Sequence, residues 1–156
     1  MHDSYDYWTL RTNGDFYGAL SYFEDERTTE GTALWADIRI GRIAEAFLFL
    51  AGMYQRLGVG PTEQLRLMIT HSGLSGRILS YSGGSSLLLQ QKKTREESHT
   101  WRRVSSTEEM ANHTAALVEE ALSGLFVLFD YYEISASRYA QFAKDYLEEF
   151  EQQRNR

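Results

Sequence analysis

The sequence predicts an α+β domain in which an antiparallel sheet packs against three helices. Three observations predict this class. An Asn13-Gly14 turn signal separates two aromatic-rich runs near the start of the chain, a long apolar pattern with helical spacing follows, and two more helical patterns close the chain. Alternating segments typical of strands lie between the helical regions. We expect a β-hairpin, a helix, two or three further strands, and two last helices that form a C-terminal αα pair.

The N-terminal hairpin is predicted from the Asn13-Gly14 dipeptide. Asn-Gly is the strongest short hairpin signal, because a type I′ turn needs positive φ at both central residues. The two strands should lie near Tyr5 to Arg11 and Phe16 to Phe23. The acidic run from Glu24 to Glu30 follows them and predicts an exposed loop.

The first helix is predicted from about Ala36 to Leu57. Apolar side chains recur at steps of three and four residues along one face. They are Ile40, Ile43, Ala44, Phe47, Ala51 and Tyr54. Other apolar residues cover most of the remaining circumference of the second half, so we expect this helix to be central. Gly58 and the Gly60-Pro61 pair end the pattern.

Short strands are predicted in the middle of the chain. Residues 65–69 alternate in the pattern of a half-buried strand, and residues 77–81 repeat it. A third strand is predicted at residues 87–91. Residues 92–104 show weak periodicity, and we expect a long exposed hairpin or a mobile segment there.

Two helices are predicted at the C-terminal end. Ser106 and Glu109 have the spacing of a capping box, so a helix should begin at Thr107 and extend to about Tyr132. Ser135 is the expected N-cap of the last helix, whose apolar face is equally regular. The chain shows no internal repeat and no linker, and we expect one domain over residues 1–156.

Composition limits the chemistry of the chain. It has 156 residues, a net charge of -6 and no Cys, which excludes disulfides, thiolate nucleophiles and Cys-ligated metal sites. The His residues are scattered and no metal or nucleotide motif occurs, so we assign no metal, no cofactor and no catalytic residue. Glu45 interrupts the longest apolar stretch, and the chain does not begin with a secretory signal. We therefore expect a cytoplasmic protein with no membrane partner.

A basic segment in the middle of the chain is the best functional candidate. Residues 76–104 hold six basic and two acidic residues, whereas acids exceed bases before and after it. Basic side chains neutralise phosphates, and an interleaved aromatic can stack on an unpaired base. The candidate contacts to nucleic acid or another anionic partner are Arg77, Lys92, Lys93, Arg95, Trp101, Arg102 and Arg103. Two glutamates interrupt the segment, so a solvated strand edge is the alternative.

A second candidate site involves Arg42, Glu45 and His71. Glu45 lies on a largely apolar helix, and a buried carboxylate needs a partner, which Arg42 or Arg39 can provide. A structural ion pair is the interpretation we favour. The functional interpretation places Glu45 and Arg42 with His71 around a small-molecule pocket, in an enzyme or a ligand-binding domain.

Aromatic residues crowd the predicted N-terminal hairpin, more than one sheet face requires. Tyr and Trp are enriched in protein interfaces, so one face of the hairpin is a candidate contact to a second copy of the chain or to a partner domain. A sheet covered on both faces by its own helices explains the pattern equally well.

Three stretches, ADIRIGRIAEAFLFLAGMYQRLGV (36–59), THSGLSGRILS (70–80) and LFVLFDYYEIS (125–135), carry a family resemblance. Together they resemble a domain that follows the N-terminal Schlafen AlbA-type domain in bacterial DNA-binding or ATP-binding proteins. The resemblance implies the C-terminal part of a larger protein, with nucleic-acid or nucleotide chemistry in the other part and no catalytic residue here. It also implies a recurrent turn formed by His71, Gly73, Leu74, Gly76 and Arg77. We therefore expect a non-catalytic accessory, sensing or assembly domain, with an enzyme as the alternative.

Overall fold

The computed structural model describes residues 6–28, 31–82, 92–130 and 134–154, and its fold is α+β as predicted. The described strands are β1 (Tyr7–Leu10), β2 (Phe16–Ala19), β3 (Ala33–Trp35), β4 (Gln64–Ser72), β5 (Ile78–Ser80) and β6 (Ser98–Ser106). The described helices are the 3-10 turn η1 (Phe23–Glu26), α1 (Ala36–Arg56), α2 (Thr107–Asn112), α3 (Thr114–Val127) and α4 (Ala136–Arg154). None of these helices is long and apolar enough to cross a membrane.

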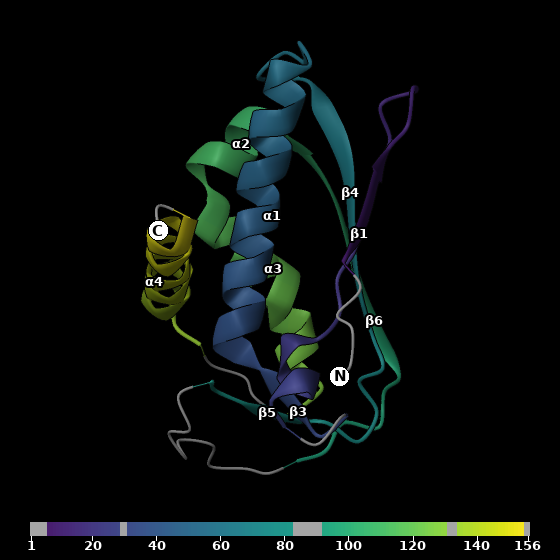
Figure 1. Ribbon diagram of the computed structural model, residues 1–156, viewed down its shortest axis with the longest axis vertical. Helices are drawn as coiled ribbons and strands as arrows, with labels where there is room; N and C mark the ends of the chain where they lie inside the picture. The colour runs from purple at the N-terminus through teal and green to yellow at the C-terminus, as the bar shows by residue number, and fades with distance from the viewer. Residues whose placement is uncertain (1–5, 29–30, 83–91, 131–133, 155–156) are drawn as a thin grey trace.

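Helix α1 runs through the middle of the molecule, with the long β4–β6 pair on one side and α4 on the other (Figure 1). The described strands form three two-stranded sheets: β1–β2 and β4–β6 are antiparallel, and β3–β5 is parallel. The β4–β6 pair is continuous from Gln64 opposite Ser106 to Ser72 opposite Ser98. The hairpin and the C-terminal pair α3–α4 are confirmed, while the strands are divided among three pairs.

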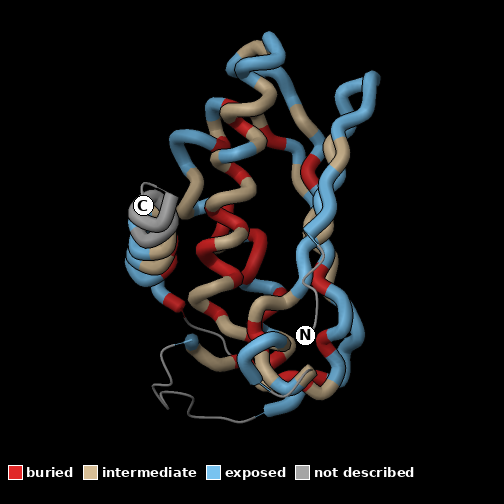
Figure 2. The backbone as a smooth tube through the Cα atoms, viewed as in Figure 1, coloured by how far each residue is buried: buried red, intermediate tan, exposed pale blue. Residues whose placement is uncertain are grey.

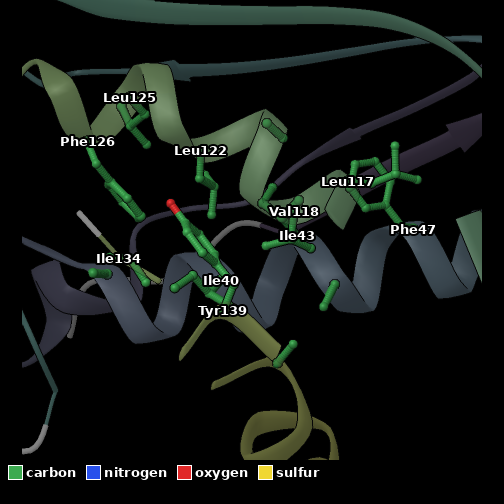
Figure 3. Close-up of a cluster of buried hydrophobic side chains, with 14 of the residues drawn as sticks. Ile40, Ile43, Phe47, Leu117, Val118, Leu122, Leu125, Phe126, Ile134 and Tyr139 are labelled. Atoms are coloured by element: carbon green, nitrogen blue, oxygen red, sulfur yellow. The ribbon is translucent and has the colours of Figure 1, made fainter. Parts of the chain in front are cut away.

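The hydrophobic core forms where α1 packs against α3 and α4. Figure 3 shows side chains of α1 and α3 pointing toward one another, with Tyr139 of α4 reaching toward Phe126, on which it stacks at 6.3 Å between ring centroids. Trp101 of β6 packs edge-on against Phe47 of α1 at 5.9 Å. The β4–β6 pair therefore docks on the same core, and buried residues follow α1 and its neighbours through the molecule (Figure 2).

The N-terminal hairpin is present, but its turn is not type I′. The Gly14 N–H donates to the Arg11 carbonyl, the Arg11 N–H donates to the Asp15 carbonyl, and of the loop residues only Gly14 has a positive φ, of 89°. This is the three-residue loop of a type I turn followed by a glycine bulge. Asn13 adopts a negative φ and donates a side-chain hydrogen bond to Asp15. The turn therefore needs only one residue in the left-handed conformation, Gly14.

The prediction that residues 24–30 form an exposed loop is wrong for Glu24. This residue lies in η1 and is fully buried. Its carboxylate accepts hydrogen bonds from the backbone N–H of Trp35 and from Arg39, so burial costs little because both oxygens are partnered. Glu26, in the same short helix, is exposed as expected.

The first predicted helix is confirmed, since α1 begins at Ala36 and ends at Arg56. Gly58 follows it with a φ of 86°, the left-handed conformation that glycine adopts at low cost. The predicted cap of α2 is also confirmed: the Ser106 hydroxyl accepts from the Glu109 N–H at 3.1 Å.

Two other expectations are corrected. The predicted helix 107–132 is divided into α2 and α3 at His113, which has a φ of -125° and a ψ of 29°. The Thr114 hydroxyl donates to the Met110 carbonyl at 2.7 Å and competes there with helical bonding. Residues 98–106 form a regular strand although their apolar periodicity is weak. Pairing with β4 satisfies the backbone hydrogen-bonding groups of this segment. The strand predicted at residues 87–91 lies outside the described residues.

Candidate functional site

Two ion pairs attach η1 to the rest of the protein in a largely buried polar cluster. We define this cluster as Tyr22, Glu24, Asp25, Arg39, His71 and Arg77. Arg39 of α1 donates to Glu24 at 3.0 Å, and its side chain is only 8% exposed. Burial lowers the pKa of Arg39, and the Glu24 carboxylate opposes this effect. The pair fixes the acidic segment against the first turns of α1.

The second ion pair joins Asp25 of η1 to Arg77, which lies just before β5. The Arg77 guanidinium donates to Asp25 Oδ1 at 2.7 Å, to the Ala33 carbonyl at 2.6 Å and to the Gly73 carbonyl at 2.7 Å. Burial opposes ionisation of Asp25, but hydrogen bonds from Arg77 and Gly31 outweigh it and hold the pKa of Asp25 below its ordinary value. Arg77 is thus fully engaged inside the protein.

Three atoms of the buried polar cluster have no hydrogen-bond partner among the described residues. They are Tyr22 Oη, Arg39 Nε and His71 Nδ1. Burial, with the charges of Arg39 and His99, lowers the pKa of His71 to about 3, and burial raises the pKa of Tyr22 to about 12. Both side chains are therefore neutral near pH 7, and the two acids balance the two arginines.

Described contacts join two of the three residues of the second candidate site, Arg42 and Glu45. Arg42 and Glu45 form an ion pair at 3.5 Å on α1, and the Tyr146 hydroxyl of α4 lies 3.5 Å from the same carboxylate oxygen. Both side chains of the ion pair are partly exposed. His71 instead belongs to the buried polar cluster, where Arg39 is the charged neighbour that most affects it. Contacts among the described residues thus bring Arg42 and Glu45 together without His71.

The outward side of the β4–β6 pair carries basic and uncharged side chains. Because side chains alternate along a strand, Leu67 of β4 and Trp101 of β6 turn toward the core while their neighbours turn to solvent. We define the ribbon face as Gln64, Arg66, Met68, Thr70 and Ser72 of β4 with Ser98, Thr100, Arg102, Val104 and Ser106 of β6. It contains no acidic residue in a chain that has 22 of them.

At the centre of the ribbon face two arginines and two apolar residues alternate. Arg66 lies opposite Val104, and Met68 lies opposite Arg102. The arginines are thus diagonal neighbours, about 7 Å apart at the backbone. Met68 is 64% exposed and Val104 is 51% exposed. In the described part of the chain, neither arginine forms an ion pair, so both guanidinium groups are available to a partner.

The residues of the predicted basic segment occupy different environments. Lys92 is paired with Asp130, and Arg103 is paired with both Glu109 and Glu120. Trp101 packs on the core and is not free to stack on a base. Arg77 is buried and paired with Asp25, so it is not exposed to an anionic partner as the sequence suggested. The other three candidates are exposed and make no described ion pair: Lys93, Arg95 and Arg102.

Sequence analysis missed Arg66, although a signal was present. Arg66 alternates with the apolar residues of a predicted strand, so its outward direction could have been inferred from the sequence. Its position beside Arg102 could not, because that depends on the register of β4 with β6. Glu24, Asp25, Arg39 and Tyr22 had no such signal, since their partners lie far away in the chain.

The described residues contain no group of three or more acidic or His side chains that could hold a metal ion. Comparison of the chain with models of protein families, with curated proteins and with solved structures found no match. Support for a function therefore has to come from the geometry of the chain itself.

Proposed function

We propose that this chain is a non-catalytic accessory or assembly module that binds an acidic protein partner through the ribbon face. The observation that carries this proposal is the central group of Arg66, Met68, Arg102 and Val104. It combines two arginines that pair with no acid among the described residues with two exposed apolar side chains, and none of its four residues is acidic. The accessory role also agrees with the resemblance of the sequence to a domain that accompanies a Schlafen AlbA-type domain.

The exposed apolar residues favour a protein over a nucleic acid. Arg and Met are enriched in protein interfaces, whose centres exclude water from apolar groups. Met68 and Val104 would gain little from a phosphate backbone, but they would be buried by apolar side chains of a protein partner. Carboxylates of that partner would meet Arg66 and Arg102 in charge-assisted hydrogen bonds.

The remaining charge of the chain also disfavours nucleic acid. The net charge is -6 and the sequence pI is near 5.2, which gives no long-range attraction to phosphates. Trp101, the aromatic residue expected to stack on a base, packs against Phe47. The same net charge also opposes an acidic protein, so binding of such a partner depends on the ribbon face, which carries no acid, and on the burial of Met68 and Val104.

The alternative of an enzyme or small-molecule pocket has less support. Arg42 and Glu45 neutralise each other, and His71 is a member of the buried polar cluster, next to Arg39. Catalysis by these three residues would require that they converge on one open site. The described contacts do not bring them together.

The test compares two charge-reversed double variants of the full chain. Arg66→Glu/Arg102→Glu changes the ribbon face, and Lys93→Glu/Arg95→Glu makes the same change of charge outside it. The probe is a fluorescent peptide of Glu and Leu, with a matched peptide in which Gln replaces every Glu. Binding is measured by fluorescence anisotropy at low and moderate salt, alongside a single-stranded DNA oligonucleotide.

We expect the Glu-Leu peptide to bind and the Gln-Leu peptide to bind more weakly. The ribbon-face variant should lose about tenfold in affinity, because two exposed ion pairs of up to about 1 kcal/mol each become repulsive contacts. The control variant should stay near the native protein. Peptide binding that ignores the ribbon-face change would overturn the proposal. DNA binding weakened by both variants would instead establish a nucleic-acid partner.

A further inference from the structure

The tip of the β1–β2 hairpin presents the dipeptide Asn13-Gly14 to solvent. Arg11, Asn13, Gly14 and Asp15 are all exposed, and Figure 2 shows the tip as the pale blue end of a projection beside the body of the protein. A Cβ placed on Gly14 would meet no atom within 4 Å apart from its chain neighbours. The backbone at Gly14 is therefore open to water and to the side chain that precedes it.

The Asn13 side chain is bent over the backbone of the turn. Its Oδ1 atom accepts a hydrogen bond from the Asp15 N–H at 3.2 Å, and its Nδ2 atom donates to Asp15 Oδ2 at 2.8 Å. An asparagine side chain that bonds the backbone two residues ahead spans the peptide unit between them. The turn thus holds Asn13 Cγ alongside the backbone nitrogen of Gly14.

This arrangement favours attack of the Gly14 nitrogen on Asn13 Cγ. The two atoms are held close by the turn, and glycine has no Cβ to obstruct ring closure. Negative charge develops on Asn13 Oδ1 during the attack, and the Asp15 N–H already donates to this atom. The Gly14 N–H must first leave the Arg11 carbonyl, which accepts it at 2.9 Å, and local opening of an exposed tip costs little.

We propose that Asn13 is a site of spontaneous deamidation and that this modification frees the hairpin tip from α1. The Gly14 nitrogen bonds to Asn13 Cγ and gives up its proton, and the side-chain amino group leaves with a proton as ammonia, so that a cyclic imide forms. Water then adds its hydroxyl to one of the two ring carbonyls and its hydrogen to the ring nitrogen. The product is aspartate, or isoaspartate when the chain continues through the former side chain. The site is separate from the ribbon face and independent of the function proposed for it.

Neither product can keep the contacts of the native tip. Both replace the Asn13 amino donor by an oxygen, so the bond to Asp15 is lost and two carboxylates become neighbours. Isoaspartate also adds a methylene to the backbone inside the loop that Arg11 and Asp15 close. This moves the Gly14 carbonyl, which accepts from the Tyr54 hydroxyl of α1 at 2.7 Å.

Few other contacts hold the hairpin to the body of the protein. Phe16 packs against Phe49 of α1 at 5.6 Å, and neither β1 nor β2 pairs with another described strand. Trp8 is 68% exposed. A two-stranded hairpin alone is marginally stable in water. Loss of the Tyr54 contact should therefore loosen β1 and β2 together and leave β4 and β6 unchanged.

A second asparagine provides an internal control. Asn112 is also exposed, but it ends α2 and is followed by His113, whose N–H donates to the Glu109 carbonyl at 2.9 Å. The Cβ of His113 obstructs ring closure, and a helical turn must open before its nitrogen can attack. Asn112 thus shares the exposure of Asn13 but not the geometry of the tip.

The experiment incubates the full chain at slightly alkaline pH and follows both asparagines by mass spectrometry of proteolytic peptides. Deamidation exchanges an amino group for a hydroxyl group and raises the peptide mass, and chromatography separates aspartate from isoaspartate. The native protein is compared with Asn13→Gln, in which an extra methylene disfavours ring closure, and with Asn13→Asp, which carries the ordinary product from the start. Hydrogen exchange of the amides of β1 and β2, relative to those of β4 and β6, measures the release of the tip.

We expect Asn13 to react at least about tenfold faster than Asn112, because only the latter must break a helical turn first. The Asn13→Gln protein should keep its mass at this position. Exchange in β1 and β2 should rise by up to about tenfold in aged native protein and in fresh Asn13→Asp, as expected for the loss of one hydrogen bond. Equal rates at Asn13 and Asn112 would overturn the assignment of the site. A deamidated tip that exchanges like the fresh native protein would overturn the release of the hairpin.

Discussion

Replacement of Glu24 by Ala should be among the most destabilising single changes in this protein. Glu24 is fully buried, and its two carboxylate oxygens accept from the Trp35 N–H at 2.8 Å and from Arg39 at 3.0 Å. The change leaves the Arg39 guanidinium buried without a counter-charge and leaves one backbone donor unpaired. Breaking a buried ion pair by removing one partner costs about 3–5 kcal/mol. We expect a loss of about 4 kcal/mol in the free energy of unfolding, measured by urea denaturation.

A double-mutant cycle separates the ion pair from the other effects of the change. Glu24→Gln and Arg39→Met each leave one buried charge alone, whereas the double variant removes both charges. Its loss should be smaller than the sum of the single losses by about 2 kcal/mol, since the two residues share one interaction. Glu26→Ala, in the same 3-10 turn but exposed, is the control and should change stability by no more than about 0.5 kcal/mol.

Two outcomes would refute this account of the buried polar cluster. A loss of less than about 1 kcal/mol for Glu24→Ala would mean that the buried Arg39 does not depend on Glu24 as its counter-charge. Strictly additive losses in the cycle would mean that Glu24 and Arg39 do not stabilise each other.

Two further predictions concern packing and pH. Gly41→Ala should destabilise the protein by about 1–3 kcal/mol, because the new methyl group would overlap the Tyr146 ring of α4. Gly52→Ala is on the same helix but has no other atom near the new methyl group, so it should stabilise the protein by up to about 1 kcal/mol. Thermal unfolding distinguishes the two, and equal midpoints would contradict the close approach of α1 to α4. The pKa of His71 is lowered to about 3, below the ordinary 6.5, so the unfolded chain binds the proton more readily. Stability should therefore be complete above about pH 6.5 and fall as the pH drops toward 3, by about 1.4 kcal/mol per pH unit from this residue. His71→Gln should flatten that slope, and an unchanged slope would exclude His71 as its origin.

The ribbon face shows which part of a site can be inferred from local patterns. Alternation in residues 64–70 is visible in the sequence, and it places Arg66 on the outside of a strand. The basic segment was also visible as a run of charge. Its division was not, because neighbouring residues of β6 point to opposite sides: Arg102 lies outward, while Arg103 pairs with Glu109 and Glu120. Only the register with β4 sets Arg102 beside Arg66.

The buried polar cluster shows the opposite case. Glu24 and Asp25 lie in an acidic run that is typical of a solvated loop. Their burial depends on Arg39 and Arg77, which are 15 and 52 residues away along the chain. A local pattern cannot predict such pairs, because the partner that makes burial of a carboxylate tolerable is contributed by another element.

The sequence by itself determined the α+β class, the N-terminal hairpin, the central helix α1 and the beginning of α2 at Ser106. Each depends on interactions between residues close in the chain: a glycine at a turn, apolar side chains three and four residues apart, a hydroxyl three residues from the N–H it caps. Tertiary structure alone decided the β3–β5 and β4–β6 pairings, the burial of Glu24 and the composition of the ribbon face. These features depend on which distant residues meet, and that is set by the packing of whole elements against one core.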